Sequence, residues 1–123
     1  MKIIIPLLPR SKKNSSQIIM CRNRPILIPS KLYLEYEKEC GYYLKRPTKA
    51  IDTPINLKCK FIVPDKRKRD LTNLLNAIQD ILVHYGILAD DNYLIVQSVD
   101  GSRIVYEKGI EKTEIEILEI KEE

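Results

Sequence analysis

The chain has 123 residues, of which 44% are hydrophobic and 31% are charged, and its formal net charge is +4. This length allows one domain with a modest core, and the composition is typical of a folded soluble protein rather than a disordered one. No apolar stretch approaches the roughly 20 residues of a membrane span, and the N-terminus lacks the features of a signal peptide. We therefore expect no membrane partner.

The predicted elements begin with a strand at Ile3–Ile5, which prolines confine to an edge or an end of a sheet. A polar, basic loop over residues 10–16 follows. Two short apolar runs, at residues 17–21 and 25–28, then flank Arg22-Asn23-Arg24 and predict a hairpin. Ser30 is placed to cap a helix that extends to about Leu44.

The second half of the chain continues with an alternating strand at Ile55–Val63. Asp70–Tyr85 is the clearest helix, with an apolar stripe at helical spacing, Asp70 as its cap and Gly86 at its end. Strands are predicted at Asn92–Val99, at Arg103–Tyr106 and at Thr113–Ile120, and residues 100–102 form either a turn or a bulge. These elements predict a single domain of the α/β (α+β) class over residues 1–123.

The three cysteines Cys21, Cys40 and Cys59 are widely and evenly spaced. An odd number fits no disulfide framework, and the spacing matches no zinc pattern. We expect three buried or half-buried thiols in a protein of the reducing cytoplasm.

Charge is distributed unevenly along the chain. Residues 1–69 hold 17 Lys and Arg against 5 Asp and Glu, whereas residues 70–123 hold 4 against 12. A basic half can bind phosphates and an acidic half can hold metal. Interleaved strands would instead mix the two signs, because halves of a sequence need not be halves of a structure.

A carboxylate cluster is the first candidate site. The face of the 70–85 helix opposite its apolar stripe has no Lys or Arg, and it carries Asp70, Asn73, Asn76, Asp80 and His84. Beyond the helix stand two adjacent acids, Asp90 and Asp91, whose repulsion a cation would offset. Mg²⁺ favours such oxygen ligands. If the chain folds back, Asp70 and Asp91 would hold a metal that activates water against a phosphodiester. Alternatively, these are an ordinary acidic cap and an acidic turn.

Basic segments are the second candidate. Lys66-Arg67-Lys68-Arg69 directly precedes Asp70, and the loop with Lys12, Lys13 and Asn14 also suits phosphate. Arg22 and Arg24 form a third basic site at the predicted hairpin tip. Together these segments favour nucleic acid as the partner, although each alone is also typical of a solvated loop. The single histidine, His84, is expected to be structural or on the surface.

The stretch from Asp65 to Asp91 resembles the RusA family of Holliday-junction endonucleases. The likeness lies in Asp65-Lys-Arg-Lys-Arg-Asp70-Leu-Thr-Asn73-Leu, in Asp80-Ile-Leu, in Gly86-Ile and in Asp90-Asp91. The loop 11–15 and the closing segment 113–117 also resemble family segments.

This resemblance implies a small mixed sheet packed by two main helices, and a homodimer that cleaves four-way DNA junctions with Mg²⁺, for which Mn²⁺ can substitute. It assigns metal binding to Asp70 and Asp91, with Asp90 beside them, and it also matches Asn73 and Asp80. It is compatible with a phage or prophage origin.

The chain departs from the family pattern at two positions. Thr72 stands where the family has a second aspartate, and Asn76 stands where it often has a lysine. Asp80 is a candidate substitute for the missing acid. Three functions therefore stay open. They are a Mg²⁺-dependent nuclease for branched DNA, a non-catalytic dimer that binds such DNA on the same scaffold, and a general α/β interaction domain whose charges only form its surface.

Overall fold

The computed structural model describes residues 1–10 and 16–121. Its elements, in chain order, are β1 (Lys2–Ile5), β2 (Ser16–Cys21), β3 (Arg24–Pro29), α1 (Lys31–Cys40), β4 (Ile55–Val63), α2 (Leu71–His84), β5 (Val96–Ser98), β6 (Arg103–Tyr106) and β7 (Lys112–Glu119). None of the described helices is long and apolar enough to cross a bilayer.

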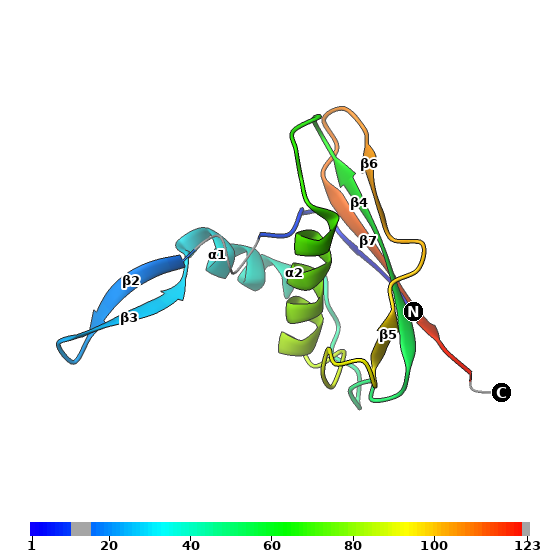
Figure 1. The fold of residues 1–123 in the computed structure, drawn as a ribbon, viewed down its shortest axis with the longest axis horizontal. Coiled ribbons are helices and arrows are strands. Elements are labelled where there is room, and N and C mark those ends of the chain that lie inside the picture. Colours follow the sequence, from blue (N-terminus) through cyan, green and yellow to red (C-terminus); the bar gives the residue numbers. More distant parts are fainter. Residues whose placement is uncertain (11–15, 122–123) are drawn as a thin grey trace.

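A mixed sheet forms the body of the protein, in the order β1-β7-β4-β5 with β6 also beside β4 (Figure 1). β7 lies antiparallel to β1 and to β4, whereas β5 and β6 run parallel to β4. Parallel neighbours need a crossover connection, and α2 supplies it. The predicted mixed sheet with two helices is confirmed.

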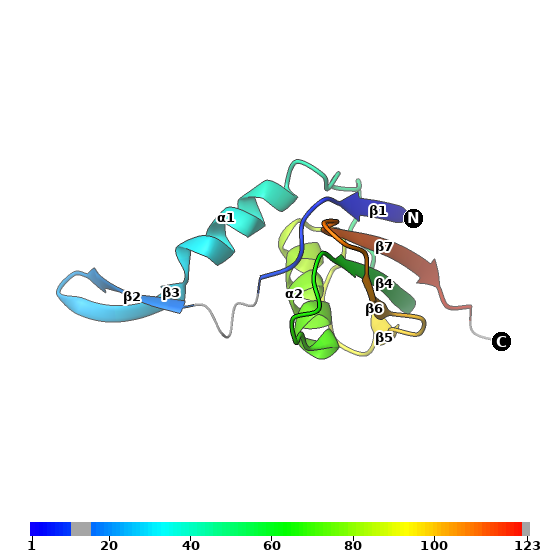
Figure 2. The ribbon, with the colours of Figure 1, turned by 90° about the horizontal axis from the view of Figure 1, so that it is seen from above.

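The core lies between this sheet and the helices. α2 lies against one face of the sheet, and no helix in the described part of the chain covers the other face (Figure 2). The predicted alternation of β4 is confirmed, because Ile55, Leu57, Cys59 and Phe61 are fully buried. The apolar stripe of α2 is confirmed as well, with these members fully buried or nearly so: Leu75, Ile78, Ile81 and Leu82.

β5 and β6 are two segments of one sheet edge, separated by a turn that ends at Ser102. The Ser102 hydroxyl donates to the Leu57 carbonyl (3.2 Å) and accepts from the Cys59 N–H (3.0 Å). Between β5 and β6, this side chain therefore satisfies the backbone groups of β4 that a neighbouring strand would otherwise bond. Gly101 has a φ of +85°, which glycine adopts without steric cost. The Ser102 N–H donates to the Val99 carbonyl (3.1 Å), so residues 99–102 form a turn, and the chain keeps its direction along β4 on both sides of it.

Two predicted elements are too long. The helix expected to reach Leu44 ends at Cys40, because the next three N–H groups bond to carbonyls three residues back and tighten the last turn. Glycine at position 41 also lets Tyr85 approach, since a Cβ there would lie 2.9 Å from the tyrosine hydroxyl.

The strand predicted over Asn92–Val99 begins only at Val96. Asn92 holds a turn before it. The Asn92 side-chain oxygen accepts from the Leu94 N–H (3.0 Å), and its carbonyl accepts from the N–H groups of Ile95 and Val96. Asparagine favours such local bonding over an extended ladder.

β2 and β3 form a separate hairpin, which projects from the body and continues into the start of α1 (Figures 1 and 2). Arg22 and Asn23 have positive φ angles of 51° and 64°, the backbone that a two-residue hairpin turn requires. The Ser30 hydroxyl accepts from the Tyr33 N–H (3.2 Å) and caps α1 as predicted. The predicted hairpin is confirmed, and we call it the arm.

The two charge signs meet on the sheet. Lys58 of β4 lies opposite Glu116 of β7, and Lys60 lies opposite Glu114. Cross-strand pairs of opposite charge stabilise a sheet. The alternative in which interleaved strands mix the two charge signs is therefore correct for this sheet. The basic and acidic halves of the sequence are not separate halves of the fold.

The cysteines differ in exposure. Cys40 and Cys59 are fully buried, but Cys21 is exposed, which contradicts the expectation that all three are at least half-buried. Cys21 is the last residue of β2, and the body does not reach it. Burial raises the pKa of the Cys40 thiol to about 11 and that of Cys59 to about 12.

These differences predict selective thiol chemistry. At neutral pH one thiol per chain, Cys21, should react with a thiol reagent within minutes, because the thiolate is the reactive form and the other two are buried and protonated. Titration with a chromogenic disulfide reagent, with and without denaturant, measures this. Two or three equivalents without denaturant would contradict the burial of Cys40 and Cys59, and a Cys21→Ser variant is the control.

Candidate active site

Asp70 caps the N-terminus of α2. One of its carboxylate oxygens accepts from the Thr72 N–H (3.0 Å), and its carbonyl accepts from the Leu74 N–H. The side chain is exposed, and the N-terminus of a helix favours an anion. Thr72, Asn73 and Asn76 are also exposed along the first turns of α2, so they border Asp70 on a face open to a ligand.

The basic segment folds as a tight turn around Asp65. The guanidinium of Arg69 donates to the Asp65 carboxylate (2.9 Å) and to the carbonyls of Asp65 and Arg67. The Arg67 N–H donates to the same carboxylate (3.0 Å). Hydrogen bonding by Arg69 and by the Arg67 backbone lowers the pKa of the Asp65 carboxyl. The side chain of Arg69 is only 19% exposed.

The four predicted cations therefore have different roles. Arg69 shapes the turn, whereas Lys66, Arg67 and Lys68 are exposed beside Asp70. The ammonium of Lys66 lies 5.2 Å from the centre of the Tyr106 ring. Sequence reasoning missed the role of Asp65, although its spacing of four residues from Arg69 is a known pairing distance.

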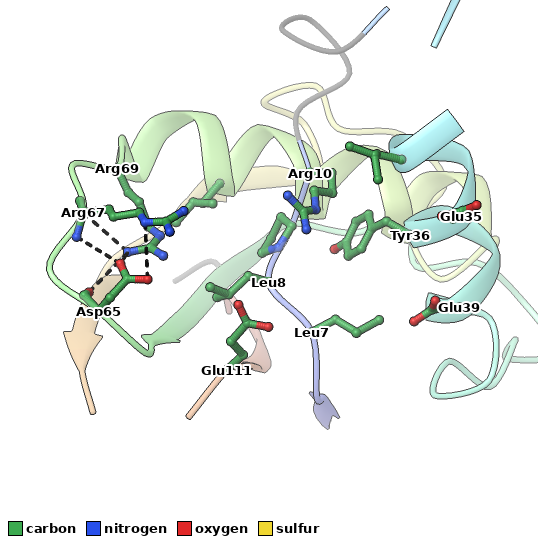
Figure 3. A pocket seen from close by; sticks show the side chains of 13 residues that line it. Leu7, Leu8, Arg10, Glu35, Tyr36, Glu39, Asp65, Arg67, Arg69 and Glu111 are labelled. Carbon is green, nitrogen blue, oxygen red and sulfur yellow. Dashed lines mark hydrogen bonds and ion pairs between the residues drawn. The ribbon is translucent and has the colours of Figure 1, made fainter. Parts of the chain in front are cut away.

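A hollow of about 510 Å³ lies next to this turn (Figure 3). Its floor is apolar and includes Leu7, Leu8 and Leu74. Charged side chains surround it, from the basic turn, from the segment before the arm, from α1 and from the residue before β7: Arg10, Glu35, Glu39, Asp65, Arg67, Arg69 and Glu111. The hollow joins the basic turn to α1.

The second acidic site lies beyond the other end of α2. The carboxylate of Asp90 accepts from the Asp91 N–H (2.7 Å) and from the Asn92 side-chain amide (3.2 Å). The hydrogen bond from the Asp91 N–H is the largest cause that lowers the pKa of the Asp90 carboxyl, and the bond from Asn92 adds to it. Both favour the ionised carboxylate. Asp91 is exposed beside it. Asp90 therefore shapes the turn on which Asp91 stands.

The two acidic sites do not meet within one chain. Between them lies α2 with its 14 residues, which at 1.5 Å per residue is about 21 Å long. In the described part of the chain, no group of three or more His, Cys, Asp or Glu side chains is placed to hold a metal ion. Asp70 and Asp91 of a single chain therefore do not fit one shared ion.

Asp80 and His84 lie on the α1 side of α2. Asp80 is half-buried, and its charge is among the causes that raise the pKa of Tyr33, after burial and Glu37. It lies eight residues beyond Thr72, about 12 Å along the helix, so it does not replace an acid at position 72 of its own chain. The imidazole of His84 pairs with Glu37 of α1 at 3.5 Å, which fits the structural role expected for it.

The remaining predicted contacts, Lys12, Lys13 and Asn14, lie outside the described residues. The described end of this segment, Arg10, lines the hollow beside the basic turn.

Comparisons with known proteins found a family model that matches most of the chain and relatives that match parts of it. A family model described as "Endodeoxyribonuclease RusA" matches residues 6–118. The "Crossover junction endodeoxyribonuclease rusA" of Enterobacteria phage HK97 is 33% identical over 90 residues, which cover 67% of this chain and 72% of the relative. The "Crossover junction endodeoxyribonuclease RusA" of Aquifex aeolicus is 37% identical over 45 residues, 37% of this chain and 36% of the relative.

The family match includes both ends of α2, the basic turn before it and the acidic turn after it, so the candidate site and the sequence likeness occupy the same residues. The chain belongs to the RusA family of endodeoxyribonucleases.

Proposed function

We propose that this protein is a Mg²⁺-dependent endodeoxyribonuclease that resolves Holliday junctions or related branched DNA as a homodimer. The observation that carries this proposal is the match of the family over residues 6–118, which includes Asp70, Asp91 and the exposed cations between β4 and α2. The names of the phage and Aquifex relatives support a crossover junction as the substrate.

The separation of the acids supports a site shared by two chains. Asp70 caps one end of α2 and Asp91 lies in the turn beyond its other end, and α2 itself is about 21 Å long. A two-fold axis that sets two α2 helices side by side in opposite directions brings Asp70 of each chain to Asp91 of the other. The dimer then has two equal sites, which suits the two strands that must be cut in a junction.

The residues of each site have separate tasks in this proposal. Asp70 and Asp91 would hold Mg²⁺, which when bound neutralises phosphate charge and makes a water more acidic. Lys66, Arg67 and Lys68 bind the neighbouring phosphates and offset their repulsion from the carboxylates. Asn73 is one turn from Asp70 and donates hydrogen bonds to the DNA backbone. Asp90 keeps the turn of Asp91 in shape.

A cleavage assay tests this function. Purified protein is mixed with a synthetic four-way junction or with the matched linear duplex, in Mg²⁺, in Mn²⁺ or in chelator. We expect nicking of the junction alone, in either metal and not in chelator. Nicking that persists in chelator would contradict the metal dependence, and equal cleavage of the duplex would contradict the selectivity.

Thr72 and Asn76 favour a second function, a non-catalytic dimer that binds branched DNA. Neither side chain supplies the charge that the family pattern has at its position, so the site holds one carboxylate and one cation fewer. Tight binding of the junction without cleavage in either metal would favour this alternative. Cleavage restored by Thr72→Asp together with Asn76→Lys would then assign the loss to these two positions.

A further inference from the structure

The arm exposes an apolar surface that the described part of the chain leaves uncovered. In its register Ile18 lies opposite Leu27 and Met20 lies opposite Pro25, and residues paired across two antiparallel strands lie on the same face. Ile18, Met20 and Leu27 are 71%, 68% and 71% exposed, and Pro25 is exposed as well. We call these four residues the apolar face. A contiguous apolar surface of this kind marks an interaction site.

The charge of the surrounding segment indicates which partner fits this surface. The first 34 residues contain seven Lys and Arg and no Asp or Glu. Within the arm the cations are Arg22 and Arg24, and both are exposed at its tip. Such a segment suits a polyanion, because each cation that binds a phosphate releases a counterion. An apolar protein partner would cover the apolar face but would not account for the absence of acids over 34 residues.

The placement of these cations fits a groove of duplex DNA. Arg22 lies in the turn, and Arg24 pairs with Cys21, so its side chain leaves the strand on the face opposite Met20 and Pro25. The last apolar pair before the tip is therefore free of charge, and two long cationic side chains lie next to it. Proteins that bind the minor groove combine these two features, since they place arginines in the groove and insert apolar wedges such as Met and Pro between base pairs.

We propose that the arm lies in the minor groove of one duplex arm of the DNA substrate, and that Met20 and Pro25 insert between two adjacent base pairs. Arg22 and Arg24 bind the phosphates next to this step. The insertion bends the duplex, so that more of the DNA lies against the protein. This inference rests on the proposed function for its substrate, branched DNA, but it requires neither metal nor cleavage.

The length of the arm determines where along the DNA the insertion occurs. Each strand has six residues and is about 20 Å long, so the tip reaches on the order of six base pairs beyond the base of the arm. The base of the arm borders the hollow beside the basic turn, because Arg10 and Leu32 both line that hollow (Figure 3). A duplex bound at the basic turn therefore passes the base of the arm first and reaches the tip about six base pairs further on.

Binding of a four-way junction in chelator tests the two cations. Arg22→Ala together with Arg24→Ala should lower the affinity about tenfold near 0.1 M salt and reduce the slope of log affinity against log salt by up to about two. The matched control, Lys38→Ala together with Lys108→Ala, removes two exposed cations elsewhere and should leave both values unchanged. Fluorescence anisotropy measures both. An equal loss in the control would assign the effect to net charge and overturn the contact.

A junction that contains 2-aminopurine tests the insertion, because the fluorescence of this base rises when stacking is lost. The base is placed at successive positions along each duplex arm. The wild-type protein should raise the fluorescence at one step away from the branch point, and Met20→Ala together with Pro25→Ala should abolish this rise. The control Ile19→Ala with Ile26→Ala truncates the pair on the opposite face and should keep it. Circular dichroism shows whether both variants fold.

The outcomes separate this inference from the proposed function. A rise that the Met20 and Pro25 substitutions leave unchanged, or no rise at any position, overturns the insertion even if the junction is cleaved. A change in oligomeric state of that variant without a change in DNA binding would assign the apolar face to a second copy of the chain and also overturn the inference. The expected rise without cleavage in Mg²⁺ supports the inference and contradicts only the nuclease function. Absence of junction binding by the wild-type protein contradicts both.

Discussion

Two inactive variants should restore cleavage when they share a dimer. We expect Asp70→Asn and Asp91→Asn each to lower junction cleavage at least about 100-fold, because each removes a carboxylate that would hold the metal. In a mixed dimer, one site then has both substitutions and the other has none. Random pairing of equal amounts makes half of the dimers mixed, so about a quarter of wild-type nicking should return.

Co-expression of the two variants with different affinity tags, followed by nicking of an end-labelled junction on a denaturing gel, measures this recovery. The control is the double variant Asp70→Asn/Asp91→Asn, which should give no recovery when it is paired with either single variant. A mixed dimer as inactive as its parents would show that each site takes its acids from one chain, and the proposed shared site would be wrong.

Neutralising the basic turn should weaken DNA binding and reduce its dependence on salt. With Lys66, Arg67 and Lys68 replaced by alanine, we expect the affinity for a junction to fall about 10-fold to 100-fold near 0.1 M salt. Each cation that contacts a phosphate contributes about one to the slope of log affinity against log salt, so the slope should decrease by up to about three. Arg69 is kept, because it holds the turn through Asp65.

Fluorescence anisotropy in chelator, over a range of salt concentrations, separates this binding from cleavage. The matched control removes three exposed cations at separate places: Lys38, Lys108 and Lys121. It changes the net charge equally, so a similar loss of affinity in this variant would mean that overall charge, rather than the basic turn, governs binding.

The sequence predicted the elements whose pattern depends on burial. The alternation of β4 and the stripe of α2 reflect one buried face each, and both are confirmed. The predicted boundaries of these elements were wrong where local hydrogen bonds and contacts decide where an element begins or ends. Asn92 holds its turn through its own side chain, and the helix at Cys40 tightens as Gly41 admits Tyr85. Neither interaction leaves a periodic signal in the sequence.

The candidate site was predictable in its residues and less so in its arrangement. Asp70 as a cap follows from helix chemistry, and the structure confirms that role. The separation of Asp70 from Asp91 follows from the length of α2, yet a sequence pattern does not say whether a chain folds back. The role of Arg69 depends on Asp65 in the same turn, so a run of four cations did not reveal which one is structural.

The contact between α1 and α2 also connects the arm to the acidic turn. The Tyr85 hydroxyl donates to the carbonyl of Glu37, and the carboxylate of Glu37 pairs with His84, so α1 is fastened to the end of α2 that leads into the turn of Asp90 and Asp91. The arm continues directly into α1 through Ser30. The arm, α1 and the acidic turn are thus connected through Glu37, so a displacement of α1 would also move the turn that holds Asp91.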